Sequence, residues 1–135
     1  MVRTMYSKYN SSKCLCNQGH KHDSRKEARR CNELHFLQMA HEISGLEVQK
    51  KYILIPAQRE PSSEVYKRGP KKGQPKDGKV IEQECSYYAD FDYIEKDGTH
   101  VVEDVKGYKD GQAYAMFKIK RKLMLYIHGI RIREI

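Results

Sequence analysis

The chain lacks the features that mark several common classes of protein. No apolar run approaches the ~20 residues that a membrane-spanning helix requires, so we expect no membrane partner. The first ten residues, MVRTMYSKYN, contain no apolar segment of the kind found in signal peptides, and we therefore expect a cytoplasmic protein. Neither a Ser-His-Asp nucleophile motif nor a phosphate-binding Gly-rich loop is present, which removes the usual signatures of serine hydrolases and P-loop proteins.

Composition favours a small, folded and basic protein. The 135 residues suit one domain with a modest core, and 39% of them are hydrophobic, which predicts a folded chain. A net charge of +8 favours an anionic partner, of which nucleic acid is the commonest. In the expected reducing compartment the four cysteines stay as thiols.

Outside the helices, the patterns predict an arm, a hairpin, two strands and a long loop. Residues 1–12 are polar and predict a loose arm, and residues 13–22 predict a short hairpin. Strands are expected over 47–56 and over 130–135. Between them, the polar stretch 58–82 predicts a mobile basic loop, which suits a solvated insertion and a nucleic-acid-binding arm equally well.

Two helices are predicted. The first covers 23–45, because Ser24 and Glu27 form a capping box and Gly45 suits a C-terminal stop. Its expected buried face comprises Ala28, Cys31, Leu34, Phe36, Leu37, Met39 and Ile43. The second helix covers 112–128. Its expected apolar stripe comprises Met116, Ile119, Leu123 and Ile127.

Two adjacent strand-like segments, 86–95 and 99–108, are joined by a tight turn and predict a hairpin. Side chains alternate along a strand, so Asp104 and Lys106 share one face, and the hairpin can bring Asp90 beside them. Carboxylates hold a hard divalent cation through oxygen, while a lysine places or activates water and offsets developing negative charge. This set of residues suits metal-dependent cleavage of a phosphodiester bond.

Four segments carry a resemblance to a known fold. They are DSRKEA at 23–28, YYADFDY at 87–93, VEDVKG at 102–107 and FKIKRKL at 117–123. Their order, together with Asp and then Asp-x-Lys on the second and third strands, resembles the PD-(D/E)XK nucleases, which include restriction endonucleases and Holliday junction resolvases. More closely, the chain is similar to small phage and prophage proteins of unassigned function that are described as resolvase-like.

The resemblance implies a fold for the whole chain. It is an α/β fold with a restriction-endonuclease-like core in a single domain over 1–135. The core would hold a mixed four-stranded sheet, made of a three-strand meander, a helix and a fourth strand, flanked by two helices. The arm at 1–12 and the loop at 58–82 fall outside the recognisable pattern.

The resemblance also implies a metal site. Asp90 corresponds to the first metal-binding aspartate, although alanine replaces the usual proline just before it. Asp104 corresponds to the second acidic ligand, and Lys106 to the lysine of the same motif. Glu27 corresponds to an acid on the first helix, and the Val105 carbonyl would complete the shell around Mg²⁺ or Mn²⁺. The cation would promote attack of water on phosphorus, and Lys106 would orient or deprotonate that water.

The resemblance and the net charge together favour DNA as the partner. The expected DNA contacts are Lys118, Lys120, Arg121 and Lys122 on the second helix, and Lys71 and Lys72 in the basic loop. Contacts of this kind to phosphate give an affinity that weakens with salt and does not depend on base sequence. The neighbouring acids Asp92 and Glu103 are interpreted as structural or surface charges.

A second metal interpretation comes from the pairs Cys14-x-Cys16 and His20-x-His22. With a three-residue turn, all four side chains share one face of the predicted hairpin, and thiolate and imidazole are zinc ligands. However, the usual knuckle has two residues between its cysteines, and these strand positions are often apolar in the resembling family. Buried packing is therefore preferred over zinc. The remaining cysteines, expected in the core, are Cys31 and Cys85.

The sequence thus predicts a metal-dependent DNA endonuclease, with branched DNA such as a Holliday junction favoured by resemblance alone. Two symmetric nicks across a junction require a twofold arrangement, so a homodimer is expected. The resemblance also implies a phage or prophage protein that acts in a bacterial cytoplasm. The alternatives are a non-catalytic nucleic-acid-binding phage protein and a zinc-stabilised interaction protein.

Overall fold

The computed structural model describes residues 13–107 and 109–135, so the predicted arm at 1–12 lies outside the described residues. The chain divides into two compact units. The first combines the described residues up to Lys50 with Tyr88–Ile135, and the second is Lys51–Tyr87. All residues of the predicted metal site belong to the first unit, and the single-domain prediction stays a prediction.

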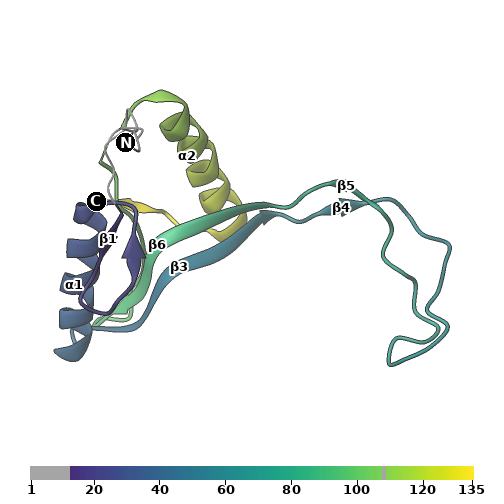
Figure 1. Ribbon diagram of the computed structural model, residues 1–135, viewed down its shortest axis with the longest axis horizontal. Helices are drawn as coiled ribbons and strands as arrows, with labels where there is room; N and C mark the ends of the chain where they lie inside the picture. Colours follow the sequence, from purple (N-terminus) through teal and green to yellow (C-terminus); the bar gives the residue numbers. More distant parts are fainter. Residues whose placement is uncertain (1–12, 108) are drawn as a thin grey trace, which may run out of the picture. The chain divides into compact units, whose positions relative to one another are not determined.

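Apart from two short strands, β4 and β5, within the predicted loop, the helices and strands follow the predicted order (Figure 1). The elements are β1 (Cys14–Leu15), β2 (Lys21–His22), α1 (Arg25–Met39), β3 (Ile43–Ile55), β4 (Gln58–Arg59), β5 (Val80–Glu82), β6 (Cys85–Glu95), β7 (His100–Asp104), α2 (Gly111–Leu123), a π-helical turn η1 (Met124–His128) and β8 (Arg133–Glu134). No helix in the described part of the chain has the length and apolar character needed to cross a membrane.

Four strands form one mixed sheet in the order β3-β6-β7-β8. β6 and β7 are the predicted hairpin and pair antiparallel, with Phe91 opposite Glu103. After α2 the chain returns as β8, which pairs with β7 in parallel and puts Asp104 opposite Glu134. The prediction of a mixed four-stranded sheet with two helices is confirmed, and the strands that carry the predicted metal ligands are the two inner ones.

The hydrophobic core of the first unit joins α1, the β1–β2 hairpin and the sheet. Its buried members are Cys16, Ala28, Cys31, Leu34, Ile43, Phe91, Tyr93 and Val101. Figure 1 shows α1 beside the hairpin, and the two are in contact. Of the two cysteines predicted in the core, Cys31 is fully buried and Cys85 is only half-buried.

α1 ends before the predicted stop. His41 takes a left-handed φ of 60°, which turns the chain out of the helix after Met39. The backbone N–H of Glu42 then donates to the carbonyl of Leu37 at 3.0 Å, which completes a Schellman closure. Gly45 lies in β3 instead, so its prediction as the helix stop was wrong. The strand predicted at 47–56 correspondingly begins earlier.

α1 begins at its predicted cap but buries a narrower face than predicted. Ser24 Oγ accepts a hydrogen bond from the backbone N–H of Glu27 at 3.1 Å. The buried helical residues are Glu27, Ala28, Cys31 and Leu34. Phe36 and Met39 are 71% and 75% exposed, which corrects the predicted face. Phe36 lies roughly opposite this buried set at about 100° per residue, and Met39 is the last helical residue.

α2 and η1 together match the predicted second helix, but the buried stripe differs from the predicted one. Met116 and Ile119 are 61% and 60% exposed, whereas Phe117 and Met124 are buried. On the same side of the helix, the half-buried Arg121 forms an ion pair with Glu134 of β8. A charged residue on this side of the helix interrupts its apolar repeat, although that residue finds a partner in the folded chain. The hydrophobicity pattern therefore favoured the neighbouring, more apolar side of the helix.

The second unit, Lys51–Tyr87, contains more backbone pairing than the predicted loop at 58–82 allowed. β4 and β5 pair antiparallel at the two ends of that stretch. A further bridge joins Val65 to Pro75 near its middle. The sequence analysis did not predict this pairing, because the polar composition of the segment carries no strand pattern, and the mobility of the basic loop stays a prediction.

Candidate active site

One open pocket of about 410 Å³ brings together every residue predicted to bind metal or act in catalysis. Its lining residues are Asp23, Ser24, Glu27, Asp90, Asp104, Val105, Lys106 and Gly107. α1 contributes Glu27, β6 contributes Asp90, and β7 ends at Asp104 just before Lys106. Residues that are distant in the sequence meet here because β6 and β7 are neighbouring strands and the first turn of α1 reaches the same pocket.

Asp90 and Asp104 lie on the neighbouring strands β6 and β7 and line the same pocket. The β6–β7 register pairs Phe91 with Glu103, and each aspartate is the next residue along its strand from that pair. Asp90 Oδ2 accepts a hydrogen bond from the backbone N–H of Val105 at 2.8 Å. Burial, followed by the charge of the Asp104 carboxylate, raises the pKa of Asp90 to about 7. Two carboxylates in such a position repel each other, and a cation between them relieves that repulsion.

Lys106 is held at the edge of the pocket by two contacts. Its Nζ lies 2.6 Å from Asp104 Oδ1. The same atom lies 3.6 Å from the centroid of the Phe117 ring, which is a cation–π contact. Phe117 lay outside the apolar stripe predicted for the second helix, so its contact with the site follows only from the packing of α2.

Gln49 joins two of the predicted acids and was missed by the sequence analysis. Its Nε2 donates to Glu27 Oε1 at 3.1 Å and to Asp90 Oδ1 at 3.0 Å. Gln49 has a left-handed φ of 56° inside β3, a backbone conformation that costs a non-glycine residue roughly 1 kcal/mol or more. Such strain concentrates at functional sites. A glutamine in a polar strand carries no pattern that identifies it, so no sequence signal was available.

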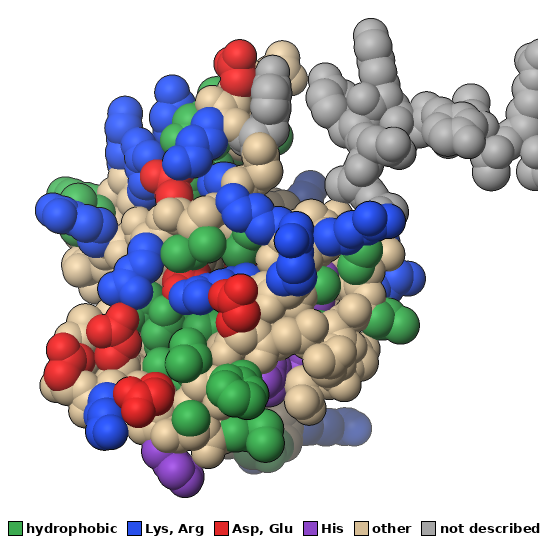
Figure 2. All heavy atoms as spheres, turned by 90° about the vertical axis from the view of Figure 1, so that its left-hand side faces the viewer, with side chains coloured by type: hydrophobic (Ala, Val, Ile, Leu, Met, Phe, Trp, Pro, Cys, Tyr) green, Lys and Arg blue, Asp and Glu red, His purple; other side chains and the backbone are tan. Residues whose placement is uncertain are grey.

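The six basic residues predicted to contact DNA differ in their exposure. The exposed ones are Lys71, Lys72, Lys118 and Lys122. Lys120 is partly buried, and the Arg121 guanidinium lies 3.0 Å from the Glu134 carboxylate. Arg121 therefore has a partner within the fold. Figure 2 shows one face of the molecule, where Lys and Arg side chains gather in the upper part of the view.

Asp92 and Glu103 are buried charges with partners away from the pocket. Asp92 Oδ1 lies 2.9 Å from His100 Nε2. Glu103 is fully buried and receives hydrogen bonds from Arg30 and from the Tyr93 hydroxyl. The interpretation of both acids as structural charges fits these contacts, and the interpretation as surface charges was wrong.

A cysteine–histidine cluster lies between the β1–β2 hairpin and α1, with a ligand set that differs from the predicted one. The predicted three-residue turn is present, since Cys14 pairs with His22 and the Cys16 N–H donates to His20 O at 3.0 Å. The possible donor atoms of Cys16, His20, His22 and Cys31 all lie within 4.8 Å of one another. Cys14 packs against the core instead, so Cys31 of α1 is the fourth member of the set.

The raised pKa of Asp90 predicts a specific pH dependence of stability. The folded state holds this proton more tightly than the unfolded chain, so the carboxyl stabilises the fold below about pH 4, and this contribution is lost as the pH rises through about 7. Asp90→Asn removes the titration. The parent should therefore lose stability between pH 4.5 and pH 8, whereas Asp90→Asn should not lose this contribution. We expect the difference in free energy of unfolding, Asp90→Asn minus parent, to increase by about 1–3 kcal/mol over this range, measured by urea unfolding without added divalent cations.

Asp97→Asn is the matched control for this experiment. A backbone hydrogen bond from Thr99 lowers the pKa of the exposed Asp97 carboxyl, so this group is ionised in both the folded and the unfolded chain above about pH 4.5, and its substitution should change stability by an amount that stays nearly constant between pH 4.5 and pH 8. A difference between Asp90→Asn and the parent that stays constant across this pH range would contradict the assignment of a raised pKa to Asp90.

Comparison with known proteins places the chain in a family without assigning an activity. The model of the DUF1064 family, described as a protein of unknown function, matches residues 6–132. No curated protein and no solved structure matches the chain significantly. The family match covers nearly the whole sequence, and the chain therefore belongs to this family.

Proposed function

We propose that this member of the DUF1064 family is a metal-dependent DNA endonuclease that hydrolyses phosphodiester bonds. The observation that carries the proposal is the single pocket in which Glu27, Asp90, Asp104 and Lys106 meet. The resemblance to PD-(D/E)XK nucleases rests on the same four residues and supports the proposal. The proposal includes the assignment of the four-stranded sheet to the restriction-endonuclease-like fold.

The donor set of the pocket fits Mg²⁺ or Mn²⁺. Both cations prefer carboxylate and carbonyl oxygens, and Asp90, Asp104 and the Val105 carbonyl would hold the ion, with Glu27 acting through water. The half-buried Asp90 carboxyl shares the pocket with the charge of Asp104, which together with desolvation raises its pKa, and such a site favours a bound cation. When bound, the cation would activate water and stabilise the negative charge that develops on the phosphate.

The chain's own residues complete the chemistry. The Lys106 ammonium, held beside Asp104 and over Phe117, is positioned to orient the attacking water and to offset charge on the phosphate. Gln49 donates to both Glu27 and Asp90 and so keeps their carboxylates turned toward the pocket. These contacts hold the site in place before substrate binds, which lowers the cost of reaching the reactive arrangement.

Charge and resemblance together indicate the substrate. The net charge of +8 and the exposed Lys118 and Lys122 favour a polyanion that is bound through its phosphates. Branched DNA is the favoured form by resemblance to the junction resolvases. Two symmetric nicks on a junction would require a twofold homodimer, which sedimentation with and without DNA would reveal.

Cleavage of labelled nucleic acids by the purified chain tests the proposal. A four-way DNA junction, a linear duplex, single-stranded DNA and a duplex RNA are incubated with Mg²⁺, with Mn²⁺ or without divalent cation. We expect cation-dependent cleavage of DNA, fastest on the junction, and a binding affinity that falls steeply with salt. The reaction without cation is the control. Tight binding without cleavage in either cation would contradict a nuclease and favour the non-catalytic nucleic-acid-binding protein.

A further inference from the structure

We propose that Cys16, His20, His22 and Cys31 bind one zinc ion in a closed structural site that does not depend on the proposed nuclease activity. Two thiolates and two imidazoles form a common ligand set for structural zinc, and the four donor atoms already lie within 4.8 Å of one another. Cys31 Sγ is 3.6 Å from His20 Nδ1. Sulfur and nitrogen ligands of a tetrahedral zinc, at about 2.3 and 2.0 Å from the metal, lie about 3.5 Å apart.

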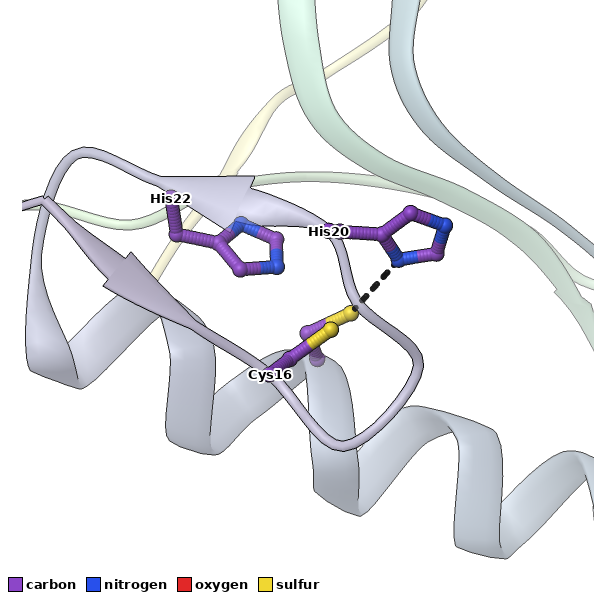
Figure 3. Close-up of side chains that lie close together, drawn as sticks. Cys16, His20 and His22 are labelled. Carbon is purple, nitrogen blue, oxygen red and sulfur yellow. Dashed lines mark hydrogen bonds between the residues drawn. The ribbon is translucent and has the colours of Figure 1, made fainter.

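The backbone positions these ligands from two directions. The three-residue turn between β1 and β2 carries Cys16 and His20 at its two ends, and His22 follows two residues later on the same side. Figure 3 shows Cys16, His20 and His22 close together above the helix, with a dashed line that joins a nitrogen of the His20 ring to a sulfur atom. Cys31 approaches from α1, one turn after the buried Glu27, and is itself fully buried.

His22 provides the observation that hydrophobic packing leaves unexplained. Its side chain is 1% exposed, and Nε2 is the single buried side-chain nitrogen or oxygen without a hydrogen-bond partner among the residues that the structure describes. Its other ring nitrogen, Nδ1, lies 3.0 Å from Glu27 Oε1. When Nδ1–H donates to that carboxylate, Nε2 carries a lone pair inside the cluster, which is the usual arrangement of a metal-binding histidine. A zinc ion supplies the missing partner.

Two histidines at the open side of the cluster have different roles in the proposed site. His35 Nδ1 lies 2.9 Å from the Cys31 carbonyl and 3.5 Å from Cys31 Sγ. Because this nitrogen is engaged by the carbonyl, His35 supports the thiolate and is not assigned as a ligand. His20 is the partly exposed member, and it lines an open pocket of about 460 Å³ together with His35, which gives the ion a path from solvent.

Cys31 also removes the objection to zinc that came from the sequence. The spacing Cys14-x-Cys16 is too short for the usual knuckle, but the second thiolate comes from α1 and not from the same strand. The site would thus tie the hairpin to the helix. Through the contact between His22 and Glu27 it would also brace one acid of the candidate active site, in the way that carboxylates commonly support metal-binding histidines.

Metal analysis of the full chain, purified without a histidine tag from zinc-supplemented cells, tests the proposal. We expect about one zinc per chain by elemental mass spectrometry in the parent protein. Cys31→Ser and His20→Asn should lose at least about nine-tenths of that zinc, because a structural site needs all four ligands. Cys14→Ser and Cys85→Ser, which change cysteines outside the ligand set, are the matched controls and should keep it.

Two further measurements keep the test decisive. His20 is partly exposed, so His20→Asn decides the outcome if Cys31→Ser fails to fold. Cobalt-substituted protein should show the visible absorption of tetrahedral Co²⁺ with thiolate charge-transfer bands, and these should be absent in His20→Asn. A folded parent without zinc, a disulfide between Cys16 and Cys31 found by peptide mapping, or zinc retained in both ligand variants would each overturn the proposal. None of these measurements depends on whether DNA is cleaved.

Discussion

Asp104→Asn is expected to reduce cation-dependent DNA cleavage about 10³-fold or more while leaving DNA binding within about twofold. Asp104 is buried, lines the pocket together with Asp90 and lies 2.6 Å from the Lys106 ammonium, so its carboxylate would be a ligand of a cation bound there. Asparagine keeps the shape of the side chain but loses the charge that a hard cation requires. Single-turnover cleavage of a labelled junction in Mg²⁺ measures the rate, and a gel-shift assay in Ca²⁺ measures the affinity.

Asp97→Asn is the matched control, since it makes the same chemical change on an exposed turn of the same hairpin. It should cleave within about twofold of the parent, as surface changes away from a site rarely matter. Circular dichroism and thermal melting of both variants show whether the fold is intact. A folded Asp104→Asn that cuts at the parental rate would remove this pocket as the active site, whatever nuclease activity the chain has.

Arg30→Met is expected to cost the largest amount of stability, about 3–5 kcal/mol of the free energy of unfolding. Arg30 donates to both oxygens of Glu103, at 2.9 and 2.5 Å, and the Glu103 side chain is fully buried. Methionine keeps much of the apolar stem but leaves the carboxylate in the core with the Tyr93 hydroxyl as its remaining hydrogen-bond donor among the side chains that the structure describes. Urea unfolding at pH 7, followed by circular dichroism, measures the loss.

Arg30 also provides its own control through a second, exposed partner. Its Nη1 lies 3.0 Å from Glu33, whose side chain is 61% exposed, so Glu33→Gln should change stability by less than about 0.5 kcal/mol. Replacing Arg30 and Glu103 together by methionine should recover most of the loss, because the isolated buried charge is then gone. If Arg30→Met and Glu33→Gln were equally mild, the Arg30–Glu103 pair would not be the buried support that its geometry indicates.

The sequence could predict that the acids and the lysine lie close together, because most of them belong to one short stretch of the chain. Asp90, Asp104 and Lys106 lie within one hairpin, and a hairpin with a tight turn sets its own register. Glu27 was expected near them only through resemblance, and the structure brings it into the same pocket through the first turn of α1. The metal and catalytic roles of all four residues stay predictions until the cleavage and substitution experiments are done.

The sequence predicted the buried faces of the two helices less well than it predicted which residues meet in the pocket. In α1 the sequence favoured Phe36 and Met39, which are exposed, and in α2 it favoured Met116 and Ile119 over the buried Phe117. A hydrophobicity pattern identifies the apolar side of a helix, but the core can also accept polar groups that find partners. Those partners come from distant strands and leave no trace in the local pattern.

Apart from β4 and β5, the sequence by itself determined the order of the elements, the N-terminal cap of α1, both predicted hairpins and the approach of Asp90 to Asp104, because these depend on residues close along the chain. Only the tertiary structure decided that Gln49 joins Glu27 to Asp90 and that Cys31 completes the cysteine–histidine cluster in place of Cys14. Both depend on how α1 packs against β3 and the hairpin. Such packing follows from the whole core, and no short segment of the sequence specifies it.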